Sequence, residues 1–222
     1  EHILIDGAST DRTLPIINSK RDQISVLVSE PDNGIYDAMN KGIKLAKGNI
    51  IGFLNSDDFY ANNEIISKVA IEFERDPYLD ACYADLIYVN KLNSKKNTRY
   101  FKSSKFKQGL FSKGWSPPHP TFFVRRSIYE KYGNFDLNYR IASDFDLMMR
   151  FLEIHKIKSR HIPEVWVKMR IGGVSNKNLK NMWLQNCEIL NSFNKNNLKV
   201  NSIIFFVYKI ISRIQQFFKK QS

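Results

Sequence analysis

Cysteine is scarce in this sequence, which contains only Cys82 and Cys187 among its 222 residues. They lie far apart and outside any CxxC or Cys/His cluster, which excludes a disulfide framework and a zinc site built on cysteine pairs. We therefore expect two reduced thiols in a cytoplasmic protein. Long apolar runs are also missing, because no stretch approaches the roughly 20 uncharged apolar residues that a membrane-spanning helix needs.

Acidic residues are few compared with basic ones. The chain has 34 Lys and Arg against 22 Asp and Glu, which gives a formal net charge of +12. Such an excess favours an anionic partner, and nucleic acid, an anionic membrane surface and a phosphorylated substrate all fit. A solvated lysine-rich surface without any partner fits equally well. Only the location of the charge can separate these interpretations.

The first sixty residues alternate between strand and helix patterns. Apolar runs at 2–6, 24–29 and 49–55 predict strands, and Ile35, Met39 and Ile43 share one face of a predicted helix over 34–48. This alternation is typical of an α/β fold with a mostly parallel sheet, in which ligands gather at the carboxyl ends of the strands. Further along, the patterns predict a helix over 63–75, a strand over 81–90, a helix over 142–155 and a strand over 161–173.

Aspartates follow several of these strands. Asp6 ends the first strand, and the stretch "GFLNSDDFY" carries Asp57 and Asp58 side by side after an apolar run. Two adjacent carboxylates resist burial unless a cation or a hydrogen-bonding ligand compensates them, and Mg²⁺ or Mn²⁺ would do so. A simple turn with a helix cap is the alternative. A third acidic site, Asp144 with Asp146, opens the late helix, where either carboxylate could merely favour the helix dipole.

Four segments together resemble the motifs of glycosyltransferase family 2, which has the GT-A fold. They are, in order, "LIDGASTDRT", "DNGIYDAMNKGIKLAKGNIIGFLNSDDFY", "HPTFFVRRSIYEKYGNFD" and "ASDFDLMMRF". The resemblance covers residues 1–175 and implies a GT-A domain with a mostly parallel central sheet flanked by helices. It also implies that the chain starts at the family's second strand, so that the first strand and helix are absent.

The resemblance assigns roles to the aspartates. It implies that Asp6 binds the nucleotide base, that Asp57 contacts the ribose, and that Asp57 and Asp58 hold a divalent cation on the nucleotide diphosphate. The catalytic base falls on Asp144. In an inverting transfer this carboxylate takes the proton of the acceptor hydroxyl as its oxygen attacks the anomeric carbon.

Two loops complete the predicted site. The turn Asp32–Gly34, with Asn33 between, lies at a strand end, where available backbone amides favour contact with the nucleotide. His119, in the proline-rich stretch "SPPHPTFF", is predicted to line the acceptor pocket, and Trp115 is predicted to stack on a sugar. Packing alone would explain both residues equally well.

We predict a helical tail over residues 176–222. It contains the basic, apolar segment 203–220. Ile203, Val207, Ile210, Ile214 and Phe217 share one face of a predicted amphipathic helix. Phe205, Phe206 and Phe218 widen its apolar surface. This favours binding to an anionic membrane surface over packing as an ordinary core helix.

These observations predict an inverting glycosyltransferase that uses a nucleotide-sugar donor and a saccharide or lipid-linked acceptor. Polysaccharide synthesis at the inner face of the cell membrane suits it, and we expect no nucleic-acid partner. One alternative is a sugar-phosphate nucleotidyltransferase, but the sequence lacks the glycine-rich, lysine-bearing phosphate loop that this class needs. The other is a non-catalytic basic module that binds membranes or nucleic acid.

Overall fold

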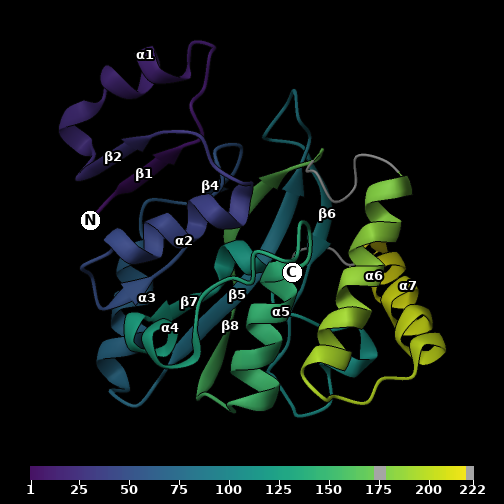
Figure 1. Cartoon of the computed structure of the whole chain (residues 1–222). Coiled ribbons are helices and arrows are strands. Elements are labelled where there is room, and N and C mark those ends of the chain that lie inside the picture. The colour runs from purple at the N-terminus through teal and green to yellow at the C-terminus, as the bar shows by residue number, and fades with distance from the viewer. Residues whose placement is uncertain (173–178, 219–222) are drawn as a thin grey trace.

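The structure is a computed structural model that describes residues 1–172 and 179–218, without the side chains of 217 and 218. Two sheets organise the described chain (Figure 1). A small parallel sheet consists of β1 (Ile3–Asp6) and β2 (Val26–Ser29), and a larger sheet has the order β3-β7-β5-β8-β4, with β6 paired to β5. The strands of the larger sheet are β3 (Ile50–Ile51), β4 (Phe59–Tyr60), β5 (Ala81–Val89), β6 (Asn97–Phe101), β7 (Phe123–Arg125) and β8 (Ser159–Arg170).

Helices surround both sheets. They are α1 (Thr13–Asn18), α2 (Ile35–Leu45), α3 (Ile65–Arg75), α4 (Arg126–Tyr132), α5 (Ser143–Met149), α6 (Leu179–Lys195) and α7 (Ser202–Phe218). The predicted helices over 34–48 and 63–75 form as α2 and α3, and each buries its apolar face, as helical spacing requires. The late helix begins at the predicted place, but a π-helical turn over Arg150–Ile154 continues it after α5.

The larger sheet is mixed. Its longest pairing, between β5 and β8, is parallel, whereas β3, β4, β6 and β7 join it in antiparallel pairs. Strand β5 is buried along nearly its whole length, which matches a mostly apolar sequence interrupted by the buried Asp85. The predicted strand over 49–55 shrinks to β3. Just after it, a Cβ added at Gly52 would lie 2.3 Å from the ring of Phe123, so this close approach requires glycine.

The two C-terminal helices pack on the same core as the sheet (Figure 1). Ile189 and Phe193 of α6 and Phe205 of α7 belong to one buried cluster with Phe145 of α5 and Tyr83 of β5. The tail therefore shares its core with the α/β domain. The predicted division at residues 175 and 176 lies outside the described residues.

Helix α7 packs on the domain through Phe205, and the face predicted to bind a membrane points away from the core. Phe205 is fully buried and Phe206 half-buried, so these two rings do not widen an exposed surface, which corrects the prediction. The predicted apolar face is itself exposed, with Ile203, Val207 and Ile210 each at least 49% accessible. Residues 219 and 220 of the predicted segment lie outside the described residues.

Candidate active site

A cavity of about 390 Å³ lies between the ends of β5 and β8, the loop before β7, and helices α5 and α7. Two of the predicted site residues, Asp144 and His119, line it. Asp144 belongs to α5 and His119 to a 3₁₀ turn over His119–Thr121, so residues from separate predicted motifs meet here.

The Asp144 carboxylate is fixed from two directions. Its Oδ1 accepts a hydrogen bond from its neighbour's backbone, the N–H of Phe145, at 2.9 Å, and lies 3.0 Å from the hydroxyl oxygen of Tyr36 on α2. The same Tyr36 hydroxyl lies 2.8 Å from the carbonyl oxygen of Ile141. Burial first, and the Asp144 charge next, raise the pKa of Tyr36, so this hydroxyl stays protonated and can donate.

The segment that leads into α5 is held by a buried glutamate. Glu188 of α6 accepts hydrogen bonds from the backbone N–H groups of Arg140, Ile141 and Ala142 at 2.8–2.9 Å. Three donors to one carboxylate compensate its burial. The tail thus sets the position of the chain immediately before Asp144.

His119 is buried against aromatic rings. Its imidazole stacks on Phe53 at 5.7 Å between ring centroids and meets the edge of Phe135 at 5.6 Å. Burial lowers the pKa of His119, and the nearby Asp144 charge opposes this effect. A neutral imidazole beside a carboxylate suits the wall of a pocket that receives a polar substrate.

Asp146 lies two residues from Asp144, but its contacts stabilise the fold. Its buried carboxylate pairs with Arg150 at 2.8 Å and accepts hydrogen bonds from Ser192 and Asn196 of α6. These partners occupy it fully. The neighbouring Asp144 is therefore the carboxylate of α5 that is available for chemistry.

Asp57 and Asp58 follow the loop after β3. Asp57 is exposed, whereas Asp58 is 7% accessible and its Oδ2 lies 3.3 Å from the Asn55 amide nitrogen. Burial first, and the Asp57 charge second, raise the pKa of Asp58 to about 6. Arg170, at the end of β8, donates to the Asp57 carbonyl oxygen at 3.2 Å and also lines the Asp144 cavity, so the aspartate pair adjoins that cavity.

The aspartate pair fits a divalent cation. The buried Oδ1 of Asp58 has no hydrogen-bond partner, and a buried carboxylate oxygen normally has one. Within the described residues, no cluster of three or more His, Cys, Asp or Glu side chains forms a metal site. A cation held by Asp57 and Asp58 would therefore need oxygens from a bound phosphate to complete its ligands.

Asp6 lies in the smaller sheet, at the end of β1. Its carboxylate accepts hydrogen bonds from the hydroxyl groups of Ser9 and Ser29, which lower the pKa of Asp6. Its side chain is 6% accessible. The described hydrogen bonds of this carboxylate all lie at the ends of β1 and β2. Asp6 does not line the Asp144 cavity.

The turn at residues 32–34 differs from the expectation of free amides. The backbone N–H of Gly34 donates to the Asp32 carboxylate at 2.8 Å, and that of Asn33 donates to the Asp37 carboxylate at 2.9 Å. These amides already have partners, which corrects the prediction that they were available. The side chain of Asp32 lies beside Gly7, directly after Asp6, so the turn does adjoin the predicted nucleotide end of the sheet.

Trp115 is half-buried and packs against other aromatic rings, and its predicted sugar-stacking role stays a prediction. Its ring meets Tyr83 and Phe111 edge-on and lies tilted against Phe106. Its indole nitrogen is buried, and the residue does not line the cavity. Its chain neighbours Gly114 and Ser116 do line the cavity, so Trp115 lies beside it.

Four cationic residues of the cavity were missed from the sequence. They are Arg99, Arg170, Lys209 and Arg213. Lys209 and Arg213 come from α7. The periodicity of the sequence indicates only that they lie outside the apolar face of that helix. The available signal was the basic character of the tail, but its meaning depends on how α7 folds back on the domain.

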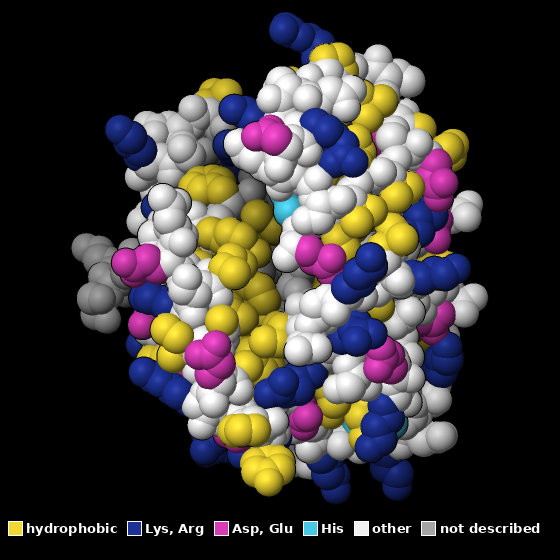
Figure 2. Space-filling model, turned by 90° about the vertical axis from the view of Figure 1, so that its left-hand side faces the viewer, with side chains coloured by type: hydrophobic (Ala, Val, Ile, Leu, Met, Phe, Trp, Pro, Cys, Tyr) yellow, Lys and Arg dark blue, Asp and Glu magenta, His cyan; other side chains and the backbone are white. Residues whose placement is uncertain are grey.

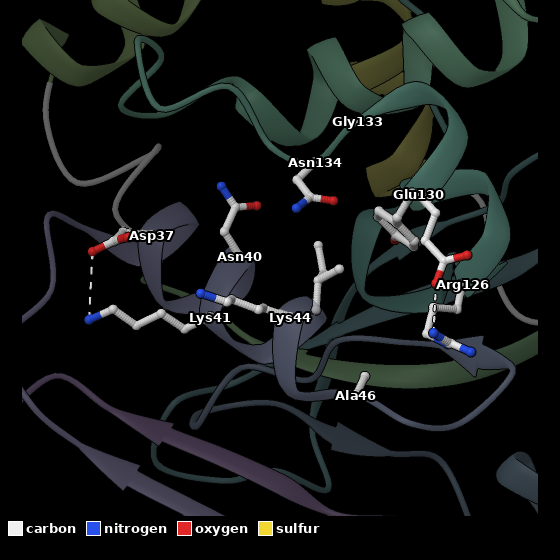
Figure 3. Close-up of a pocket in the computed structure, with 11 residues that line it drawn as sticks. Asp37, Asn40, Lys41, Lys44, Ala46, Arg126, Glu130, Gly133 and Asn134 are labelled. Atoms are coloured by element: carbon white, nitrogen blue, oxygen red, sulfur yellow. Dashed lines mark hydrogen bonds and ion pairs between the residues drawn. The ribbon is translucent and has the colours of Figure 1, made fainter.

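A larger hollow of about 670 Å³ lies between α2 and α4 (Figure 3). None of the predicted site residues lines it. Its charges largely neutralise one another, since Lys41 pairs with Asp37 and Arg126 pairs with Glu130. We therefore assign the chemistry to the smaller cavity. On the face of the molecule seen in Figure 2, hydrophobic side chains also line the floor of a hollow whose rims carry charges of both signs.

Comparison with known sequences decides the family. The model of glycosyl transferase family 2 matches residues 1–133. The chain belongs to glycosyl transferase family 2. It is 30% identical over 181 residues to a PGL/p-HBAD biosynthesis glycosyltransferase of Mycobacterium bovis, covering 79% of this chain and 68% of that protein. An uncharacterized glycosyltransferase of Rickettsia typhi is 28% identical over 99% of this chain and 71% of its own length.

Solved structures of other proteins share the fold. A fragment of TarS from S. aureus, residues 1–349, superposes with a TM-score of 0.62 at 16% identity, covering 96% of this chain. The mannosyltransferase PcManGT from Pyrobaculum calidifontis superposes with a TM-score of 0.59 at 16% identity over 94% of this chain. The chain spans 62% of the solved TarS fragment and 59% of the solved PcManGT chain. The predicted GT-A-type α/β fold is thereby confirmed.

Proposed function

We propose that this member of family 2 transfers a sugar, with inversion, from a nucleotide-sugar donor to a hydroxyl group of a saccharide or lipid-linked acceptor. The observation that carries the proposal is the Asp144 carboxylate, oriented by Tyr36 in a cavity that adjoins the Asp57 and Asp58 pair. The solved relatives support a donor of this class, since TarS is bound to UDP-GlcNAc in one structure and PcManGT to GDP-Man and Mn²⁺ in another.

In the proposed mechanism Asp144 acts as the general base. Its carboxylate takes the proton from the acceptor hydroxyl while that oxygen forms a bond to the anomeric carbon. The bond between the anomeric carbon and the phosphate oxygen breaks, and the nucleoside diphosphate leaves with the electron pair. The hydrogen bonds from Tyr36 and the Phe145 N–H keep the carboxylate aimed at the acceptor.

Asp57 and Asp58 would hold a divalent cation against the donor's diphosphate, with Mg²⁺ and Mn²⁺ both suited to oxygen ligands. When bound, such a cation neutralises charge on the leaving group. The unpartnered buried oxygen of Asp58 supports this role. Asp6, with Asp32, Asn33 and Gly34 beside it, is proposed to bind the nucleoside, and His119 the acceptor.

We also propose that α7 rests on an anionic membrane surface. Its exposed row of Ile203, Val207, Ile210 and Ile214 offers an apolar face to the interface, and the chain's net charge of +12 would be attracted to anionic lipids. Among the described residues, no helix is both long and apolar enough to cross a bilayer. Attachment to the surface and synthesis of a cell-surface glycan from a lipid-linked acceptor would suit this arrangement.

The test is a screen of UDP- and GDP-sugars against the full chain, with binding measured by calorimetry in the presence of Mg²⁺ or Mn²⁺. The proposal predicts saturable binding of one donor and slow release of its nucleoside diphosphate. A correctly folded chain that binds none of these donors would contradict it. Binding of nucleic acid or vesicles alone, unaffected by substitution of Asp144, would favour the non-catalytic alternative.

A further inference from the structure

The charges around the Asp144 cavity are unbalanced. Among the described residues that line it, four are Lys or Arg and one is a carboxylate. In the larger hollow, by contrast, two of the three lining cations form ion pairs with the two lining carboxylates. A cavity that concentrates positive charge next to a single carboxylate is suited to a ligand that brings negative charge of its own.

Lys209 reaches this cavity because α7 approaches the domain closely. Gly114 adopts a left-handed conformation, with φ of 71°, and a Cβ there would lie 3.1 Å from the Cβ of Lys209. The helix is anchored nearby by Phe205, which is fully buried. Packing of α7 against the domain therefore fixes the position of Lys209.

The ammonium group of Lys209 retains capacity for a ligand. It donates to the side-chain oxygen of Asn186 at 2.7 Å, and within the described residues it forms no ion pair with a carboxylate. An ammonium group has three donors, so two remain. Burial first, and the Arg213 charge second, lower the pKa of Lys209 to about 8, whereas Asp144 acts in the opposite direction. A bound anion would offset both the burial and the repulsion from Arg213, which disfavour the charged ammonium group.

We propose that Lys209 and Arg213 of α7, together with Arg170 of β8, bind a phosphate group of a substrate next to Asp144. This inference rests on the proposed function and deepens it. Helix α7 thereby contributes to substrate recognition as well as to the core. Lysine and arginine supply the charge-assisted hydrogen bonds that phosphate oxygens accept most strongly.

Two substrates could carry this phosphate, namely the donor, as its diphosphate, and the acceptor, as a phosphate ester. We assign the phosphate to the acceptor, because the acceptor hydroxyl must lie against the Asp144 carboxylate, and Asp144, Lys209 and Arg213 line the same cavity. Asp57 and Asp58, which are proposed to serve the donor's diphosphate, do not line this cavity, and the contact between their loop and the cavity is that of Arg170 with the Asp57 carbonyl oxygen.

The experiment measures the binding of glycerol phosphate, a simple phosphate monoester, to the full chain by calorimetry, with and without saturating UDP. The variants are Lys209→Gln and Arg213→Gln, with Lys91→Gln, an exposed lysine in the loop before β6, as the charge-matched control. Arg213 is exposed, so its variant keeps the fold even where Lys209→Gln loosens α7. Lys209→Arg keeps the charge and should restore binding.

We expect Lys209→Gln and Arg213→Gln to weaken glycerol phosphate binding about tenfold, as loss of a charge-assisted hydrogen bond does, and Lys91→Gln to leave it unchanged. Binding that persists with UDP present assigns the site to the acceptor. Binding that UDP displaces, with UDP itself weakened by both variants, assigns it to the donor.

Affinities for glycerol phosphate and for UDP that agree within about twofold across all variants would overturn the inference. Donor turnover in the same preparations separates this result from failure of the proposed function. If the wild type turns over its donor normally and the α7 variants do the same, only the proposed phosphate site is refuted. Absence of any nucleotide-sugar binding by the wild-type chain removes the proposed function itself.

Discussion

The hydroxyl oxygen of Tyr36 lies 3.0 Å from Oδ1 of Asp144, although the two residues are 108 positions apart in the sequence. This contact joins α2 to the start of α5. It places an uncharged donor on the carboxylate that we assign as the base. Because the backbone N–H of Phe145 binds the same oxygen, the carboxylate keeps one direction even without substrate.

Substitution of Tyr36 by Phe should reduce turnover without unfolding the protein. Loss of a hydrogen bond to a charged group leaves the carboxylate less well oriented, and we expect kcat to fall about tenfold while donor Kd stays constant. Tyr139→Phe is the matched control, since its hydroxyl bonds to Asn191 outside the cavity. A kcat equal to that of the wild type would show that Tyr36 does not position the base.

Asp58→Asn should separate cation binding from folding. Without metal, the variant should have a thermal midpoint several degrees higher, roughly 3 °C, because an unpartnered buried carboxylate is replaced by a neutral amide. Addition of Mn²⁺ and UDP should then raise the midpoint of the wild type more than that of the variant. The measurement is a thermal unfolding series with and without the cation.

Asp57→Asn is the companion to this experiment, because Asp57 is exposed. Its metal-free midpoint should match that of the wild type, while its response to Mn²⁺ and UDP should be reduced. Identical responses to the cation in the wild type and both variants would remove the aspartate pair as a metal site.

The sequence predicts the elements around the site better than it predicts the site itself. Helix α2 and strand β5 follow directly from apolar spacing, because local periodicity and burial agree there. Asp144, predicted from the family resemblance, and His119, predicted from its loop, line one cavity in the structure. Lys209 could not be predicted, because its role depends on a long-range contact between α7 and Gly114 that no local pattern encodes.

Trp115 and the turn at Asn33 and Gly34 show the opposite limit. A tryptophan in a proline-rich loop can stack on a sugar or on other rings, and the sequence does not say which partner is nearer. Likewise, the same residues could form a turn with free backbone amides or a turn whose amides donate to the carboxylates of Asp32 and Asp37. In the structure local hydrogen bonds close the turn and aromatic rings pack around Trp115, and both are properties of the folded chain.

Glu188→Gln should lower both stability and activity. An amide oxygen is a weaker acceptor than the carboxylate, so the three N–H groups of residues 140–142 lose part of their stabilisation, at a cost of about 1–3 kcal/mol. Because this segment leads directly to Asp144, kcat should fall as well. Glu74→Gln, at an exposed position of α3, is the control. Unchanged denaturant midpoints for Glu188→Gln would mean that this capping is not needed.

Ile210→Glu should abolish binding to anionic vesicles while leaving the fold intact, since Ile210 is 59% exposed on α7. A carboxylate on the apolar face opposes insertion into the interface and is repelled by anionic lipids. Leu92→Glu, at a 97% exposed position in the loop before β6, controls for the added charge. Equal co-sedimentation of both variants and the wild type with anionic vesicles would contradict the membrane role of α7.

The most direct test of the account replaces each aspartate of α5 by asparagine and measures donor affinity, turnover and thermal midpoint for both variants. Asp144→Asn should abolish transfer, with donor Kd and midpoint unchanged, because its carboxylate acts on the acceptor proton. Asp146→Asn should instead lower the midpoint, because it weakens the buried pair with Arg150. Turnover by Asp144→Asn close to that of the wild type would contradict the assignment of Asp144 as the catalytic base.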